Sequence, residues 1–248
     1  MIISINQPAY LPWLGYFDRI ARSDLHIVLD NVQIERNTKS SFTNRNKIRT
    51  RQGWSWLTVP VSRGNSQEDK VINKVKIDGH HWARKHYLSL VQSYNLAPYF
   101  SEHKDSFEYF YNQTWTYLAQ LLRESTDYLL KILEIRTPLL FSSEMNVNGE
   151  KSDLILNLCK AAGATTYLSG PFGRDYLDMA VFNAAGVDII FQDYNHPVYI
   201  QYHGDFVPYM SIVDLIFNHG KDSLGVLLGK DQDNTGNISG QAVSGIDL

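Results

Sequence analysis

The chain has 248 residues, of which 44% are hydrophobic and 20% are charged, and its formal net charge is −3. These values are typical of a globular protein that is long enough to bury a substantial core. A protein that binds nucleic acid by neutralising phosphates usually carries a basic excess. The net charge therefore argues against that class and leaves room only for a local basic patch.

The cysteine content and the hydropathy pattern indicate in which cellular compartment the protein is expected. Cys159 is the single cysteine of the chain, which excludes an intrachain disulfide, and its apolar helical surroundings predict a small buried side chain rather than a nucleophile. No run reaches the roughly 20 apolar residues that a membrane span needs. The N-terminus lacks the pattern of a signal peptide, so we expect a cytoplasmic protein without a membrane span; the sequence sets no oligomeric state.

The first thirty residues predict a strand, a helix and a second strand. Residues 2–5 form a β-branched run, two prolines then delay regular structure, residues 14–23 have helical periodicity, and residues 25–29 form a second apolar run. Because a strand–helix–strand crossover joins parallel strands, the pattern predicts an α/β fold with a mainly parallel sheet of Rossmann type.

The next segment is polar and basic. Residues 31–53 predict a loop rich in arginine and lysine, and residues 56–61 predict a strand. A glycine-rich and charged stretch over 62–70 predicts a mobile loop, and residues 75–77 predict a further short strand.

Residues 80–136 have helical periodicity, with large side chains at every fourth position: Trp82, His86, Leu90 and Tyr94. Thr126-Asp127 is predicted to cap the last helix of this segment. We expect the segment to be a helical insertion in one α/β domain that spans residues 1–229. Residues 230–248 have few apolar side chains, which predicts a disordered tail.

The last third returns to alternation of helices and strands. The patterns predict a helix over 152–162, a strand over 165–169, a helix over 176–185 and a strand over 187–191. Ser211 then precedes an apolar run in the pattern of a helix cap.

Four segments with candidate site residues begin at or follow predicted strand ends. The first is the loop after residues 2–5, and the carboxyl end of a strand is where α/β proteins bind ligands. A rigid turn built from prolines and aromatic side chains is the structural alternative. The candidate substrate-binding residues in this loop are Asn6, Gln7, Tyr10, Trp13 and Asp18.

The second segment begins at Asp30, which ends the predicted strand over 25–29. Arginine and lysine side chains bind phosphate or carboxylate, arginine through two parallel hydrogen bonds. A solvated polar loop is the alternative. Asp30 is a candidate proton acceptor, and the candidate substrate-binding residues are Gln33, Arg45, Asn46 and Lys47.

The third segment joins a predicted strand to a helix and holds Ser169, Gly170 and Arg174 as candidate substrate-binding residues. Glycine lets the backbone approach a ligand closely, and a helix start favours an anion. The segment lacks the Lys-Ser/Thr pair of a phosphate-binding P-loop and the Gly-x-Ser-x-Gly pattern of serine hydrolases. A cradle for phosphate or an oxyanion and an ordinary turn remain the two interpretations.

The fourth segment follows the strand over 187–191. His196 is a candidate general base, because imidazole titrates near neutral pH, and a structural histidine is the alternative. Tyr199 and Gln201 are candidate substrate-binding residues. No metal is expected, because the histidines at 80, 81 and 86 lack carboxylate or cysteine partners at a recognisable spacing.

These segments make the chain resemble the WbqC-like family over residues from about 1 to 228. The resemblance is carried by Gln7-Pro8, Tyr10-Leu11-Pro12-Trp13, Gly15-Tyr16-Phe17-Asp18, Asp30, Val32-Gln33, Arg45-Asn46-Lys47-Ile48, Trp56-Leu57-Thr58-Val59-Pro60-Val61, Tyr167-Leu168-Ser169-Gly170, Gly173, Tyr176-Leu177-Asp178, Pro197, Tyr199, Gln201 and Asp214-Leu215-Ile216-Phe217-Asn218. Family members often have a histidine before the Gln-Pro pair, where this chain has Asn6.

The resemblance implies a role among bacterial lipopolysaccharide and O-antigen genes. It leads us to expect an enzyme that transfers an acyl or aminoacyl group onto an amino sugar, with a nucleotide-linked sugar as substrate and a nucleotide or an activated acyl or aminoacyl donor as cofactor. The alternatives are a HUP-like ATP-dependent nucleotidylyltransferase or ligase and a non-enzymatic binding partner of other pathway proteins. The basic residues between 36 and 51 also keep a tRNA-borne donor open.

Overall fold

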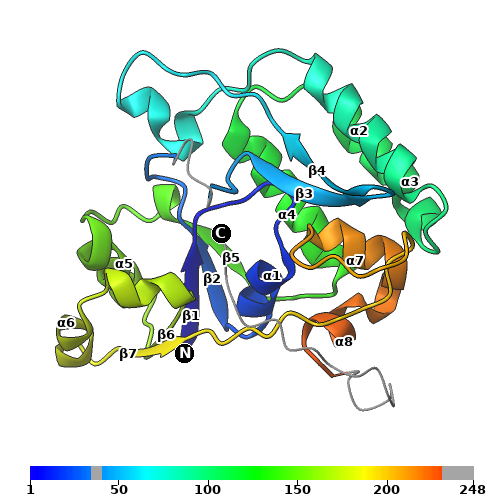
Figure 1. Cartoon of the computed structure of the whole chain (residues 1–248). Helices are drawn as coiled ribbons and strands as arrows, with labels where there is room; N and C mark the ends of the chain where they lie inside the picture. The colour runs from blue at the N-terminus through cyan, green and yellow to red at the C-terminus, as the bar shows by residue number, and fades with distance from the viewer. Residues whose placement is uncertain (35–40, 231–248) are drawn as a thin grey trace.

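A five-stranded parallel sheet forms the centre of the protein (Figure 1). The computed structural model describes residues 1–34 and 41–230. The strands are β1 (Ile2–Asn6), β2 (Leu25–Val28), β5 (Leu139–Phe141), β6 (Thr166–Ser169) and β7 (Asp188–Phe191), in the order β5-β2-β1-β6-β7. All four neighbouring pairs are parallel, which confirms the predicted α/β fold with a mainly parallel sheet.

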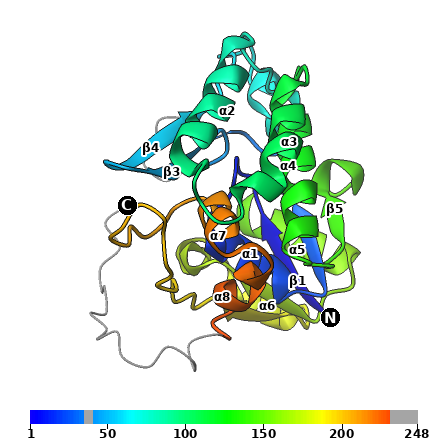
Figure 2. The ribbon, with the colours of Figure 1, turned by 90° about the vertical axis from the view of Figure 1, so that its right-hand side faces the viewer.

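Helices cover both faces of the sheet (Figures 1 and 2). One face carries α1 (Leu14–Ala21), α4 (Leu118–Ile132) and α7 (Ile212–His219), which share one hydrophobic core with the short α8 (Ser223–Leu227). The other face carries α5 (Lys151–Ala161) and α6 (Met179–Ala184), which form a second core with Ile3, Ile5 and Ile27.

The strand order explains why the helices divide in this way. Connections between parallel strands are right-handed, so a chain that moves from β1 to β2 and β5 places its helices on one face. The chain then crosses back to β6 and β7 and places α5 and α6 on the opposite face. The order therefore reverses between β1 and β6, which makes this pair the topological switch point of the sheet.

The segment between β2 and β5 holds α2 (His81–Tyr94), α3 (Phe100–Asn112) and α4, which agrees with the helical periodicity over 80–136. The predicted cap at Thr126-Asp127 is wrong, because both residues lie inside α4. A continuous apolar stripe keeps this helix unbroken; its buried leucines are Leu118, Leu121, Leu122, Leu129 and Leu130.

An antiparallel hairpin precedes these helices. It consists of β3 (Arg45–Thr50) and β4 (Gly53–Thr58), so part of the expected basic loop is a strand. The side chains of β3 alternate: Asn46 and Ile48 are buried while Lys47 between them is half-exposed, as expected for a strand with one covered face. The expected strand over 75–77 contributes only isolated bridges, next to the short 3₁₀ helices η1 (Glu68–Lys70) and η2 (Ile72–Lys74).

The remaining elements are short. Three more 3₁₀ turns occur at η3 (Ser142–Glu144), η4 (Pro171–Asp175) and η5 (Gly220–Asp222). Ser211 caps α7 by accepting a hydrogen bond from Val213 N, as predicted, and Asp178 caps α6 through its carboxylate. The predicted tail lies outside the described residues apart from Lys230.

Cys159 is fully buried in α5, which confirms its predicted packing role, and burial raises the pKa of its thiol to about 12. No helix in the described ranges is long and apolar enough to cross a membrane.

A buried carboxylate joins the helical insertion to the C-terminal part of the chain. Asp214 of α7 accepts hydrogen bonds from Tyr94 Oη at 3.0 Å, Tyr199 Oη at 2.8 Å and Gln201 Nε2 at 2.8 Å. Burial raises the pKa of the Asp214 carboxyl above its usual range, although the three donors oppose the shift.

This raised pKa predicts how stability depends on pH. In the unfolded chain the carboxyl titrates near about 4. Between that value and the higher pKa of the folded protein, the folded state holds a proton that the unfolded state has released. Wild-type stability, compared with that of Asp214→Asn, should therefore fall as the pH rises through this window, by about 1.4 kcal/mol for each unit of raised pKa.

The measurement is the free energy of urea unfolding of both proteins between pH 4 and pH 8. A difference that stays constant, or that grows in favour of the wild type as the pH rises, would contradict the prediction.

Candidate functional site

The carboxyl ends of the strands bring together polar groups from four segments. Asn6 ends β1, Asp30 follows β2, Ser142 and Ser143 follow β5, and Ser169 ends β6 just before Gly170. Ligands of doubly wound α/β proteins bind along this edge, beside the switch point. In Figure 1 the strands run upward, so the edge lies beneath the hairpin and the helical insertion.

Asp30 is the most firmly held of these groups. The residue is 5% exposed. Its carboxylate accepts hydrogen bonds from Ser143 N at 2.9 Å and Ser143 Oγ at 2.7 Å. Ser142 Oγ lies 3.1 Å from Asp30 Oδ1 and also contacts the Asp30 backbone N–H. The turn after β5 therefore fixes the orientation of the carboxylate.

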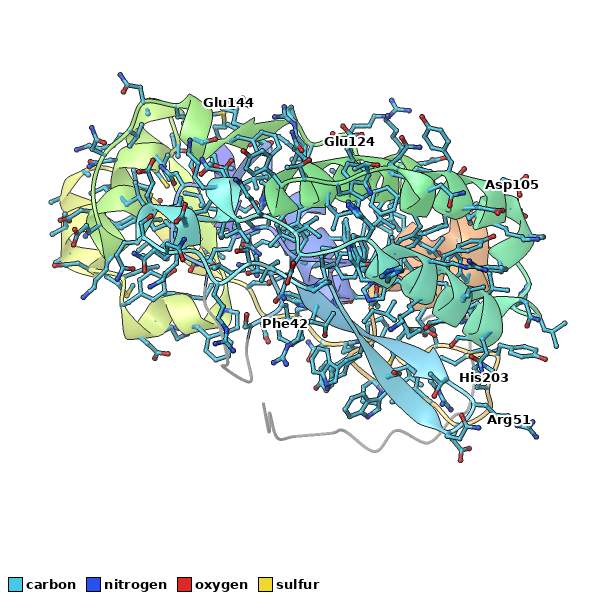
Figure 3. The ribbon with its side chains drawn as sticks, turned by 90° about the horizontal axis from the view of Figure 1, so that it is seen from above. Phe42, Arg51, Asp105, Glu124, Glu144 and His203 are labelled. Atoms are coloured by element: carbon cyan, nitrogen blue, oxygen red, sulfur yellow. The ribbon has the colours of Figure 1, made fainter. Side chains whose placement is uncertain are left out.

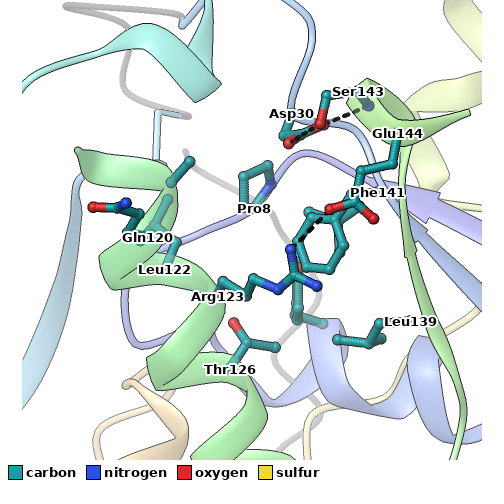
Figure 4. A pocket seen from close by; sticks show the side chains of 13 residues that line it. Pro8, Asp30, Gln120, Leu122, Arg123, Thr126, Leu139, Phe141, Ser143 and Glu144 are labelled. Carbon is teal, nitrogen blue, oxygen red and sulfur yellow. Dashed lines mark hydrogen bonds and ion pairs between the residues drawn. The ribbon is translucent and has the colours of Figure 1, made fainter. Parts of the chain in front are cut away.

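A pocket of about 170 Å³ opens beside Asp30, between α4 and the ends of β2 and β5 (Figure 4). Arg123 of α4 forms an ion pair with Glu144 at 2.9 Å, and its guanidinium lies 3.8 Å from the ring centre of Phe141. The remaining wall supplies ring faces, a hydroxyl and an amide, from Pro8, Tyr16, Thr126, Leu139 and Gln120. Carboxylates, donors and flat apolar faces in one small volume suit a polyhydroxy compound that carries a positive group.

The loop after β1 is held in shape from outside the pocket. Leu11 has a positive φ of 43°, and Asn46 Nδ2 donates to Leu11 O at 2.6 Å while Lys47 N donates to Asn46 Oδ1 at 2.8 Å. Tyr10 is fully buried, and its hydroxyl contacts Tyr111 Oη and His86 Nδ1. Among the candidates, Tyr10 and Asn46 therefore anchor this loop, while Trp13 stays half-buried beside Phe42.

Arg45 and Lys47 lie on the hairpin rather than in the pocket. The Arg45 guanidinium lies 4.5 Å from the ring centre of Trp56, and Lys47 Nζ lies 4.7 Å from that of Trp54. Figure 3 shows the hairpin at the edge of the molecule, near the labelled Phe42, Arg51 and His203. Arg36 and Lys39 of the same basic stretch fall outside the described residues.

His196 lies in the segment after β7, packed among the rings of Tyr199, Phe206 and Tyr209. Its Nδ1 lies 2.8 Å from Pro197 O, and its Nε2 accepts from Tyr209 N at 3.2 Å. Burial lowers the pKa of this imidazole. Both ring nitrogens are thus occupied by backbone partners, and His196 does not line the pocket beside Asp30.

The other candidates have local partners. Asp18 bonds to Arg22 Nε at 2.6 Å and to Gln192 Nε2 at 2.7 Å. Arg174 lies over the Phe191 ring, Gln33 contacts Gln67, and Gln7 is half-buried behind Asn6. Tyr199 and Gln201 belong to the buried Asp214 cluster.

Several groups at the edge escaped the sequence patterns. Ser142 and Ser143 follow a strand of only three residues, and Arg123 and Glu144 lie far apart in sequence and meet through the fold. Arg19, on α1, has its guanidinium against Gly170. Within the described residues no three His, Cys, Asp or Glu side chains are grouped as a metal site would require.

The fold and this edge define a doubly wound α/β protein with a polar pocket at the strand ends. The chain belongs to the WbqC-like protein family, whose sequence model matches residues 7–226. It is 37% identical over 223 residues to the uncharacterized protein Rv1507c of Mycobacterium tuberculosis, a match that covers 89% of this chain and 95% of that protein. No solved structure matches the chain.

The anchoring role of Asn46 predicts a stability effect. Asn46→Ala leaves the Leu11 carbonyl and the Lys47 N–H of a buried turn without their partner, which should lower the free energy of unfolding by about 1–3 kcal/mol. Asn112→Ala, at the exposed end of α3, is the matched control and should change it by less than about 0.5 kcal/mol. Urea titrations of both variants measure the effect, and equal values for the two would contradict it.

Proposed function

We propose that the protein is a transferase of bacterial surface-polysaccharide, or O-antigen, biosynthesis that moves an acyl or aminoacyl group onto the amine of a nucleotide-linked amino sugar. The biological setting of this proposal is what the resemblance to WbqC-like proteins implies. The observation that carries the chemistry is the Asp30 carboxylate, buried, oriented by Ser142 and Ser143, and facing a pocket with a second carboxylate at Glu144.

The pocket supplies what an amino sugar needs. An ammonium group is stabilised near carboxylates, more strongly where water is excluded. The side chain of Pro8 offers an apolar face to a sugar ring, while Thr126 and Gln120 offer hydrogen bonds to its hydroxyls. Phe141 keeps its orientation because Arg123 covers it and is itself held by Glu144.

The transfer step requires a proton acceptor. The bound ammonium first releases one proton to solvent, and the neutral amine nitrogen then attacks the acyl carbonyl carbon. The bond from that carbon to the donor's leaving group breaks, and the second proton of the attacking nitrogen passes to Asp30 and then to the departing group. We assign this acceptor to Asp30 rather than to His196, whose two nitrogens are occupied by backbone partners.

Binding of amine-bearing sugars tests the proposal. UDP-glucosamine should bind the wild type at least 10-fold more tightly than UDP-N-acetylglucosamine, because acetylation removes the positive charge that Asp30 attracts. Asp30→Asn should abolish this preference and lower the rate of acyl transfer by about 100-fold or more. Titration calorimetry and a transfer assay with activated acyl and aminoacyl donors provide the two readouts.

Asp105→Asn removes an exposed carboxylate of α3 and serves as the control; it should leave both readouts unchanged (Figure 3). Equal binding of the amine and the acetamide across a panel of nucleotide sugars would sink the proposal.

A tRNA-borne aminoacyl group is a second candidate for the donor, favoured by the hairpin. Trp54 is 47% exposed, and the hairpin carries the cationic side chains of Arg45, Lys47 and Arg51 outside the core, with no Asp or Glu between residues 45 and 58. Exposed rings next to cations suit single-stranded nucleic acid, whose bases stack while its phosphates are neutralised.

Filter binding of tRNA at increasing salt tests this candidate. Lys47→Gln should weaken tRNA binding and reduce the slope of log affinity against log salt by about 1, the value for one lost phosphate contact. Trp54→Ala should weaken tRNA binding by about 1–3 kcal/mol, because a base loses its stacking partner. Lys104→Gln, an exposed lysine of α3, is the control. An affinity that neither hairpin variant changes would remove the tRNA-borne donor from consideration.

A further inference from the structure

We propose that Arg19 is a binding residue for a phosphate group at the switch point between β1 and β6. The inference rests on the proposed function only in naming the source of that phosphate, a nucleotide-linked sugar. The site itself is argued from three features of this edge: a buried guanidinium without a partner, a glycine that makes room for it, and an unpaired amide beside both.

Arg19 is a buried cation that forms no ion pair within the described residues. The residue is 8% exposed, and its Nε is buried without a hydrogen-bond partner. The adjacent Asp18 bonds to Arg22 Nε and Gln192 Nε2 and gives Arg19 only a minor favourable charge effect. Burial lowers the pKa of Arg19, in agreement with an environment that opposes its charge. Buried charges in folded proteins are normally paired, so this guanidinium calls for an anion.

The guanidinium lies directly against the backbone at the end of β6. A Cβ built on Gly170 would lie 2.6 Å from Arg19 Nη1 and 3.2 Å from its Cζ. Gly170 has an ordinary φ of −69°, so the glycine is required for space and not for backbone conformation. An anion that reaches Arg19 therefore also meets the open backbone of the turn after β6, where the sequence had suggested a phosphate cradle.

An unpaired amide lies on the other side of the switch point. β1 and β6 pair with Ser4 beside Leu168, and continuing this register places Asn6 beside Gly170. The Asn6 Oδ1 is buried without a hydrogen-bond partner, and no partner of the amide nitrogen occurs among the described residues. An amide can rotate to present its N–H₂ group, so Asn6 and Arg19 supply donors from both strands of the pair.

A phosphate is the anion that fits these groups. Guanidinium binds phosphate oxygens through parallel hydrogen bonds, and the switch point is where doubly wound sheets bind phosphorylated ligands. Tyr16 links the two parts of the edge. It lines the pocket beside Asp30, and its neutral hydroxyl is buried near Arg19 without a hydrogen-bond partner. A phosphate at Arg19 would thus hold a sugar whose amine reaches Asp30.

Calorimetric titration of the full chain with inorganic phosphate, UDP, UDP-glucosamine and ATP tests the site. Arg19→Met, which keeps the length of the side chain, should weaken binding of each phosphate compound that the wild type binds by at least 10-fold. Arg84→Met, an exposed arginine of α2, is the control and should leave it unchanged. UDP-glucosamine binding more tightly than ATP would identify a sugar nucleotide as the source of the phosphate, and the reverse order would identify a nucleoside triphosphate.

Unfolding in the absence of ligand separates a binding arginine from a structural one. Removing an unpaired buried charge should leave the melting temperature of Arg19→Met equal to that of the wild type or higher. Gly170→Ala keeps the arginine and displaces its flexible end, so it should also weaken phosphate binding. If Arg19→Met does not fold, the phosphate affinity of Gly170→Ala tests whether Arg19 binds the anion. Wild-type affinity for phosphate compounds in either folded variant, or no affinity in the wild type, would overturn the proposal.

The two proposals fail in different ways. If phosphate binding depends on Arg19 but no amine accepts an acyl group, the phosphate-binding site is supported and the transferase proposal is refuted. Acyl transfer that Arg19→Met leaves intact, with unchanged affinity for the nucleotide sugar, would refute the anion site alone.

Discussion

The burial of charge at and above the carboxyl edge of the sheet is the constraint on which the rest of the structure depends. Moving a charged group out of water is costly unless hydrogen bonds or an opposite charge compensate. Asp214 meets this requirement only in part, with two tyrosine hydroxyls and an amide that do not offset the cost of its burial. Asp30 is held by the two serines after β5. The buried Nε of Arg19 has no hydrogen-bond partner.

The surroundings of Asp214, Asp30 and Arg19 indicate different roles for the three residues. The donors around Asp214 come from α2 and from the segment before α7, so its cluster joins parts of the fold. Asp30 keeps a side toward the pocket although its position is fixed. A fixed carboxylate at a cavity can bind or accept a proton without reorganising, which is what preorganised sites require.

The sequence predicted the sheet well and the pocket poorly, for identifiable reasons. β1, β2, β6 and β7 are short apolar runs bounded by turn residues, a local pattern. β5 has only three residues, and β3 was hidden because the half-exposed Arg45 and Lys47 alternate with the buried Asn46 and Ile48. A sequence in which basic residues alternate with other residues resembles that of a solvated loop, as long as the elements that cover one face of the strand are unknown.

The site residues divide along the same line. The sequence predicted the place of Asp30, Ser169 and Gly170 at the edge of the sheet, because strand ends are predictable from local sequence. Arg123 and Glu144 were not, since the ion pair between α4 and the turn after β5 exists only in the folded chain. Arg19 was missed for a related reason: a single cation on an amphipathic helix normally points to solvent, and only the position of Gly170 shows that this one does not.

The helical insertion determines how such a site could change its ligand. The sheet supplies Asn6, Asp30 and Gly170 from strand ends, which the parallel register fixes. The opposite wall of the pocket comes from α4, through Gln120, Arg123 and Thr126. Because α4 is continuous and held by its own leucine stripe, its outer turns can vary without disturbing the strands. Under the proposed function, selectivity for the ligand is therefore expected to depend on α4, while the position of Asp30 depends on the sheet.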